Sequence, residues 1–283
     1  MANNSLKGLR VVVVGASAGI GRAVAQEAAR QGASVVFSAR RADKLAEAVD
    51  EAGAGTPVTA DVRDPASCVA LVEQAVAELG AIDAIVYATA ASPLHRLPDS
   101  TTDTWAQVIE TNVVGAHEVI RAALPHLAPN AVVAVLSSDS VGTPRAGLVP
   151  YASSKAALEE LLRGWRNERP QVRWTCVTVG PTVPTEFGID FDPELMVEIF
   201  AEWSQQGHVD ASFMTTIEVG NVIVGTLALL ASNPSVNCDH VVFRPSGASA
   251  DGTDQRQAAF DEKISAEDPS GPARRAESGA GGS

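Results

Sequence analysis

Residues 9–30 read LRVVVVGASAGIGRAVAQEAAR, and this stretch joins three local patterns. The valine-rich run from Leu9 to Val14 is typical of a buried strand, and Arg22 to Arg30 has the apolar spacing of a helix. Glycines in the turn between them let the backbone approach a pyrophosphate, which the amide groups and dipole of the helix N-terminus stabilise. The stretch predicts a strand, turn and helix with a dinucleotide site; a glycine turn without a ligand is the alternative. The residues predicted to hold the pyrophosphate are Gly15, Ser17, Gly19, Ile20 and Gly21.

Six further strand-like runs alternate with helical patterns long enough for crossover connections. They are Ser34 to Ala39, Thr56 to Ala60, Ile82 to Tyr87, Ala131 to Leu136, Trp174 to Val179 and His240 to Phe243. This alternation predicts an α/β fold of Rossmann type, a doubly wound seven-stranded parallel sheet with helices on both faces. We expect a single domain over residues 1–248. Residues 249–283 are rich in Gly, Ala, Ser and charge, which predicts a disordered tail.

Composition narrows the class of protein. A net charge of −13 argues against a nucleic-acid partner. The first ten residues lack an apolar signal core, and the longest apolar stretch, Val222 to Ala231, is too short to span a bilayer. The three cysteines and five histidines show no metal-binding spacing. We therefore expect a cytoplasmic protein with reduced cysteines, no metal, no membrane contact and a small-molecule substrate.

Tyr151 and Lys155 stand four residues apart, and Ser138 stands thirteen residues before Tyr151. A free phenol has a pKa near ~10 and is a poor base at neutral pH. In a helix, Lys155 would share a face with Tyr151 and hold positive charge near its oxygen. Ser138 could then hydrogen-bond a carbonyl oxygen. The pattern predicts a proton-transfer site; a solvated surface pair of Tyr and Lys is the alternative.

The spacing Gly-x-x-x-Gly-x-Gly, followed by Ser138 and by Tyr151-x-x-x-Lys155, resembles the classical short-chain dehydrogenase/reductase family over residues 6–245. The resemblance implies that Tyr151 is the general acid and base, that Ser138 orients the substrate, and that Lys155 lowers the tyrosine pKa and holds the nicotinamide ribose. It implies that Asn112 supports a proton relay through water. The cofactor contacts that it implies besides are Asp61 and Val62 at the adenine, the backbone of Ala88 and Thr89, and Pro181, Thr182, Val183 and Thr185 at the nicotinamide carboxamide.

The end of the second predicted strand indicates which cofactor is preferred. An acid there would bind the ribose hydroxyls of NAD, whereas an arginine would pair with the 2′-phosphate of NADP. The chain has Ala39 followed by Arg40 and Arg41. We therefore expect NADP(H) to be favoured over NAD(H), with Arg40 as the first phosphate ligand and Ser17 or Arg41 assisting. Two solvated loop arginines are the alternative.

Tyr87-Ala88-Thr89-Ala90 departs from the Asn-Asn-Ala-Gly usual in the family, so the amides that brace the central sheet are missing. The departure leaves open a non-catalytic NADP(H)-sensing or scaffold protein on the same fold, as an alternative to an oxidoreductase acting on a carbonyl or secondary alcohol. The resemblance also implies a lid at about residues 184–216, where apolar side chains pack a helix onto the body or line a pocket for an apolar substrate. It further implies a homodimer or homotetramer. The candidate interface positions are Val113, Val119, Leu158 and Leu162, with burial in the monomer core as the alternative.

Overall fold

The computed structural model describes residues 5–208 and 212–246. Seven parallel strands form one sheet in the order β3-β2-β1-β4-β5-β6-β9. The chain order reverses direction between β1 and β4, as in a doubly wound sheet. The predicted fold is confirmed. The strands are β1 (Arg10–Val14), β2 (Ser34–Ala39), β3 (Thr56–Thr59), β4 (Ile82–Tyr87), β5 (Leu127–Ser138), β6 (Arg173–Val179) and β9 (His240–Phe243).

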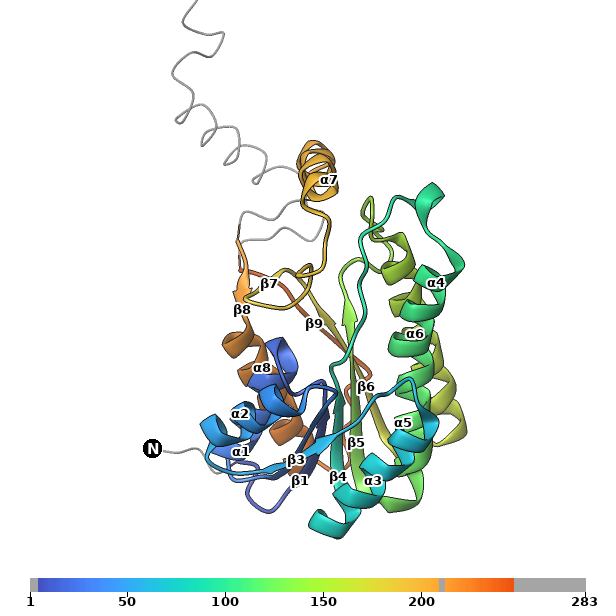
Figure 1. The fold of residues 1–283 in the computed structure, drawn as a ribbon. Helices are drawn as coiled ribbons and strands as arrows, with labels where there is room; N and C mark the ends of the chain where they lie inside the picture. Colours follow the sequence, from blue (N-terminus) through green and yellow to red (C-terminus); the bar gives the residue numbers. More distant parts are fainter. Residues whose placement is uncertain (1–4, 209–211, 247–283) are drawn as a thin grey trace, which may run out of the picture.

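Helices cover both faces of the sheet (Figure 1). One layer holds α1 (Gly19–Arg30), α2 (Ala42–Ala52) and α8 (Thr216–Ser232). The other holds α3 (Pro65–Leu79), α4 (Thr102–Ile109), α5 (Gly115–Ala123) and α6 (Val149–Glu168). A π-helical turn, Glu110–Val114, joins α4 to α5. The two layers make the core two-sided, which is why the strands are apolar at successive positions.

Strand β1 shows this burial directly. Val11 and Val13 pack into the cluster formed with α1 and α8, while Val12 and Val14 pack into the cluster formed with α3 and α5. All four side chains are at most 1% exposed. Since successive side chains of a strand point to opposite faces, an uninterrupted valine run is what a sheet buried on both sides requires.

Strand β5 begins at Leu127, before the predicted start at Ala131. Its early part pairs with the start of β4, and the register shifts between Ile82 and Ala84. Beyond this shift, β5 pairs with β4 up to Val135 and with β6 up to Ser138. The carboxyl ends of β1, β4, β5 and β6 therefore meet at one edge of the sheet, where parallel α/β folds bind ligands.

A small insertion stands over this edge. Strands β7 (Thr182–Val183) and β8 (Met214–Thr215) pair with each other, and α7 (Pro193–Gln205) lies between them in the chain (Figure 1). Ile199 and Trp203 of α7 are buried against Leu94 and Leu148. Leu195 and Met196 of the same helix pack, partly buried, against this cluster, whereas Phe200 is 42% exposed.

Three of the candidate interface positions serve the monomer core. Val119, Leu158 and Leu162 are at most 1% exposed and pack beneath α5 and α6. The predicted tail at residues 249–283 lies outside the described residues. Over the ranges 5–208 and 212–246, none of the helices has the length and apolar character needed to cross a membrane.

Candidate active site

The turn between β1 and α1 is closed by glycines that tolerate no side chain. Gly15 has a φ of +94°, and a Cβ placed there would lie 2.7 Å from the backbone nitrogen of Thr89. A Cβ on Gly21 would lie 2.2 Å from the Gly15 carbonyl oxygen. No side chain caps the start of α1 at Ala18, so the first amide groups of the helix remain available. The turn therefore fits a pyrophosphate, and Ser17, Gly19 and Ile20 lie within it.

Arg41, rather than Arg40, is held at the end of β2. Arg41 Nη2 donates to Ser17 Oγ at 3.2 Å, and Nη1 donates to Glu186 Oε1 at 2.9 Å. Lys44 Nζ lies 3.5 Å from the same carboxylate. These pairs raise the pKa of Arg41 and lower that of Glu186. Arg40 is exposed and makes no ion pair within the described part of the chain, so the structure brings together only Arg41 and Ser17 of the predicted phosphate ligands.

The segment after β6 crosses over the glycine turn. A Cβ on Gly19 would have Thr185 as its nearest neighbour, at 3.9 Å. Thr182 Oγ1 donates to the Gly180 carbonyl at 2.9 Å, and Pro181 O accepts from Met214 N at 3.0 Å. Thr182 and Val183 form β7. This segment thus passes the glycine turn on its way from β6 to α7.

Asp61 follows β3, and its carboxylate is paired with Arg63. Arg63 Nη2 lies 2.8 Å from Asp61 Oδ2, and Arg63 N donates to Oδ1 at 3.0 Å. These hydrogen bonds lower the pKa of Asp61. The neighbouring Val62 is buried and would contact any side chain added at Gly115. The carboxylate proposed to meet an adenine ring is therefore already hydrogen-bonded to a local partner.

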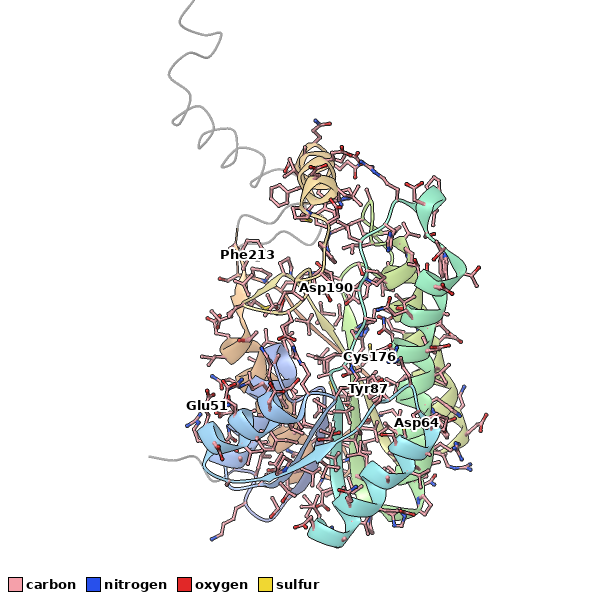
Figure 2. The ribbon with its side chains drawn as sticks, viewed as in Figure 1. Glu51, Asp64, Tyr87, Cys176, Asp190 and Phe213 are labelled. Carbon is pink, nitrogen blue, oxygen red and sulfur yellow. The ribbon has the colours of Figure 1, made fainter. Side chains whose placement is uncertain are left out.

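The segment after β4 is held to the helices by a tyrosine hydroxyl in place of the side-chain amides usual in the family. The Tyr87 hydroxyl donates to the carbonyl of Thr111, in the π-helical turn, at 2.5 Å, and the Tyr87 side chain is fully buried. Figure 2 labels Tyr87 near the middle of the molecule. Ala88 N donates to the Val14 carbonyl, which extends the β1–β4 ladder. The expected loss of bracing amides is thus offset by a phenol that reaches from the sheet to the helix.

Asn112 also ties this segment to the helices. Its Nδ2 donates to the Ala91 carbonyl at 2.9 Å and to Ser154 Oγ at 2.8 Å, while its Oδ1 accepts from Ala91 N at 2.7 Å. The side chain is fully buried in the π-helical turn. Asn112 therefore holds the β4 loop against α6, with both amide hydrogens and one acceptor position of Oδ1 in use.

Ser138, Tyr151 and Lys155 lie buried at the end of β5 and the start of α6. Ser138 Oγ accepts from Ser140 N at 3.2 Å and is 2.9 Å from Ser140 Oγ. Lys155 Nζ donates to the Leu136 carbonyl at 2.7 Å and lies 5.8 Å from the centre of the Tyr151 ring. The predicted helical spacing is confirmed, and it places the ammonium group beside the phenol ring.

The pKa values of these groups follow from burial. Burial raises the pKa of Tyr151 to about 12, and its hydrogen bond to Ser138 acts in the opposite direction. Burial lowers the pKa of Lys155 to about 8, while the charges of Cys176 and Glu159 favour its protonated form. The expected lowering of the tyrosine pKa is therefore not found in the free protein. Desolvation of the phenolate has the largest influence on Tyr151, and the Lys155 ammonium is directed at the Leu136 carbonyl.

Aromatic side chains of the lid cover the buried tyrosine. The Phe187 and Tyr151 rings meet edge-on, with 5.4 Å between their centroids. Phe191 packs edge-on against Phe187, with 5.6 Å between the ring centroids. Leu94 and Leu148 pack against Ile199 and Trp203 of α7. The Phe187 ring thus lies against Tyr151, while Ser138 and the charges of Asp139 and Arg145 act on the Tyr151 hydroxyl.

Three further residues that shape this region are not among the predicted site residues. Ser140 positions Ser138, Ser154 joins Asn112 to α6, and Glu186 pairs with Arg41. The repeated serines at 137, 138 and 140 were the available signal for Ser140. Glu186 is 145 positions from Arg41 in the chain, and no local pattern links them.

Comparisons with known proteins agree with this architecture. The family described as short chain dehydrogenase matches residues 10–194. A short-chain dehydrogenase/reductase of Cladobotryum is 32% identical over 208 residues, which cover 71% of this chain and 80% of the relative. A putative ketoacyl reductase of granaticin polyketide synthase from Streptomyces violaceoruber is 33% identical over 192 residues, 65% of this chain and 72% of the relative.

Among solved structures, a short chain dehydrogenase from Burkholderia cenocepacia in complex with NADP has a TM-score of 0.73. It is 23% identical in sequence, with 84% of this chain and 97% of that chain aligned. This similarity supports the fold, while the family match spans most of the sheet, including the glycine turn, Ser138, Tyr151 and Lys155. The chain belongs to the classical short-chain dehydrogenase/reductase family.

Proposed function

We propose that this chain catalyses NADP(H)-dependent hydride transfer to or from the carbonyl or secondary-alcohol carbon of an apolar small molecule. The observation that carries the proposal is the buried group of Ser138, Tyr151 and Lys155, at the same edge of the sheet as the glycine turn. When bound, the cofactor supplies or accepts the hydride. The protein must then bind the substrate oxygen and move one proton to or from it.

The three side chains suit these tasks. In reduction, the Tyr151 hydroxyl donates its proton to the substrate oxygen as the carbon accepts the hydride. Ser138 can orient that oxygen because Ser140 already donates to Ser138 Oγ and leaves the Ser138 hydroxyl proton free to be directed elsewhere. Lys155 places positive charge beside the phenol, where it favours the tyrosinate left after proton transfer.

The preference for NADP(H) rests on Arg41 and Ser17. A guanidinium can pair with the 2′-phosphate through two hydrogen bonds, and Ser17 lies within hydrogen-bond distance of that guanidinium. Arg40, exposed on the same loop, would add positive charge. The NADP found in the Burkholderia relative is consistent with this preference.

An apolar ketone is the substrate class that fits the surroundings of Tyr151. Phe187 packs edge-on against the Tyr151 ring, and Phe191 packs on Phe187. The ketoacyl reductase name of the Streptomyces relative points to the same reaction type.

The test combines binding with turnover. Tryptophan fluorescence should report binding of NADPH and NADH, and absorbance of the reduced cofactor should fall on addition of an apolar ketone. Tyr151→Phe should abolish turnover and leave NADPH affinity nearly unchanged. Since the chain has two tyrosines, Tyr87→Phe is the matched control and should keep turnover. Binding without turnover on any carbonyl would instead favour an NADP(H)-sensing role, and tighter binding of NADH would refute the cofactor preference.

A further inference from the structure

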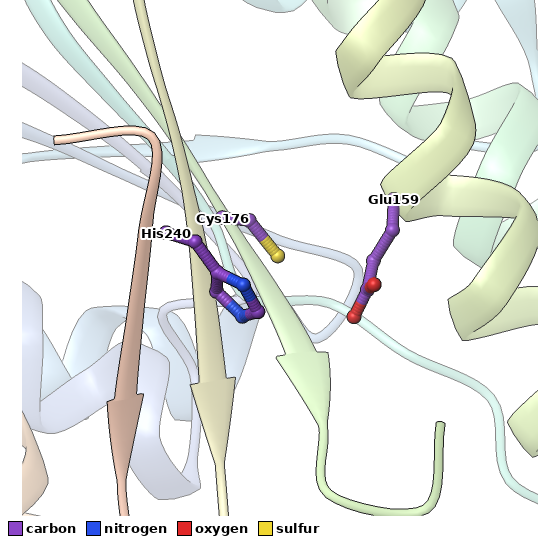
Figure 3. Close-up of side chains that lie close together, drawn as sticks. All are labelled: Glu159, Cys176 and His240. Carbon is purple, nitrogen blue, oxygen red and sulfur yellow. The ribbon is translucent and has the colours of Figure 1, made fainter. Parts of the chain in front are cut away.

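Behind the catalytic group, three side chains able to bind a metal converge from three elements. Glu159 lies on α6, Cys176 on β6 and His240 at the start of β9. Cys176 and His240 are direct register partners, so their side chains leave the sheet on the same face. One potential ligand atom from each residue lies within 4.8 Å of the other two (Figure 3).

We propose that Glu159, Cys176 and His240 form a site for a divalent cation of the zinc class, separate from the dinucleotide site. Thiolate and imidazole select such borderline-soft ions, whereas magnesium and calcium prefer oxygen ligands alone. The thiolate and the carboxylate together balance the charge of a dication. His240 is exposed, which gives the ion a route from solvent and leaves a fourth position for water.

Hydrogen bonds already orient two of the three proposed ligands, His240 and Glu159. Thr178 Oγ1 is 2.7 Å from His240 Nε2, so Nδ1 is the ring nitrogen left for a metal. Ser137 Oγ donates to Glu159 Oε1 at 2.6 Å. Partners of this kind fix the direction of ligands in metal sites.

In the described part of the chain, nearby basic side chains do not form an ion pair with the Glu159 carboxylate. On α6, Lys155 donates to the Leu136 carbonyl and feels the charges of Glu159 and Cys176 without pairing with either. Arg163 pairs with Glu160. Arg166 lies 3.3 Å from Asp239 and donates to the Trp174 carbonyl. Within the residues that the structure describes, Glu159 makes no ion pair. Its carboxylate thus faces a thiol and an imidazole without a cation in contact.

The three ligand atoms need to move only slightly closer together to bind one ion. Ligand atoms about 2.0–2.3 Å from a tetrahedral zinc ion are about 3.3–3.8 Å apart, so rotamer changes of the order of 1 Å would complete the site. Burial and the Glu159 carboxylate raise the pKa of Cys176 to about 11, so metal binding must release the thiol proton to solvent. A bound ion would tie α6, which carries Tyr151 and Lys155, to the last strand of the sheet.

The experiment uses the full chain, first treated with a chelator and then titrated with cobalt(II). We expect one equivalent to bind and to produce a thiolate-to-cobalt charge-transfer band that zinc(II) abolishes. Zinc should also raise the melting temperature. Cys176→Ala should eliminate the band, and Cys238→Ala, at the cysteine next to the site in the chain, should retain it.

Affinity provides a second measure. His240→Gln changes an exposed position and should weaken cobalt binding at least about tenfold, while Thr178→Val should weaken it about 10- to 100-fold through the lost orienting contact. The melting temperature of each metal-free variant checks that it folds. The proposal is overturned if the wild-type chain gives no band, or if the band persists in Cys176→Ala.

Discussion

Glu186→Gln should raise the affinity for NADPH by releasing Arg41. Arg41 binds both carboxylate oxygens of Glu186, with Nη1 at 2.9 Å and Nη2 at 2.5 Å. A 2′-phosphate would require the same two donors, so carboxylate and phosphate compete for one guanidinium. Glutamine keeps the size of the side chain and removes its charge.

The size of the effect follows from exposure. The side chains of Arg41 and Glu186 are 43% and 32% exposed, so solvent screening limits their ion pair to about 0.4–1 kcal/mol. At about 1.4 kcal/mol per factor of ten, relief of this competition should tighten NADPH binding about two- to fivefold. NADH has no 2′-phosphate, and its affinity should change by less than about twofold.

Fluorescence titration with each cofactor and calorimetric titration with 2′,5′-ADP measure the effect without turnover. The gain should shrink at high salt, because exposed charges are screened. Arg41→Gln should weaken NADPH binding, and in that background Glu186→Gln should have little further effect. A loss of NADPH affinity in Glu186→Gln, or an equal gain for NADH, would refute the competition.

Three further changes test other parts of the structure. Tyr87→Phe removes the buried hydrogen bond to Thr111 O and should lower the free energy of unfolding in urea by about 1–2 kcal/mol. Gly21→Ala would place a Cβ 2.2 Å from the Gly15 carbonyl, so it should cost about 1–3 kcal/mol of stability and weaken NADPH binding; unchanged binding would contradict the pyrophosphate assignment. Burial lowers the pKa of Lys155 from 10.5 to about 8. Below pH 8 the folded protein bears the full free-energy cost of burying the Lys155 charge. Between pH 8 and 10.5 the folded chain has lost this proton while the unfolded chain still holds it, so the cost decreases and stability rises with pH. Urea unfolding should therefore show wild type gaining about 1–3 kcal/mol relative to Lys155→Met over this window, and parallel pH curves would contradict the assigned pKa.

The sheet was predictable because its strands are buried on both faces, and valine runs such as Val11 to Val14 report that environment locally. The start of β5 was missed because Pro129 and Asn130 are typical of a loop. Asn130 indeed has a φ of +62°, and only the pairing of Leu127 with Ile82 extends the strand past it.

In the candidate site, contacts within one helix were predictable from the sequence, whereas contacts between distant segments were not. Tyr151 and Lys155 share one helix, so their spacing alone predicted their proximity. The contact between Glu186 and Arg41 depends on how the lid crosses the sheet edge, and the Glu159, Cys176 and His240 cluster depends on the β6–β9 register. Ligand spacing along the chain gave no metal pattern because these ligands meet only in the folded sheet.

Burial of Tyr151 also predicts how the two directions of the reaction depend on pH. With a pKa of about 12, Tyr151 is protonated at neutral pH, which is the form that the proposed ketone reduction requires. Alcohol oxidation needs the tyrosinate, which burial disfavours, so its rate should rise with pH. Reduction should stay level up to about pH 8 and then decline as Lys155 loses its charge. Initial rates measured in both directions between pH 6 and 10 would check this, and an oxidation rate independent of pH would show that Tyr151 is not the group that accepts the proton.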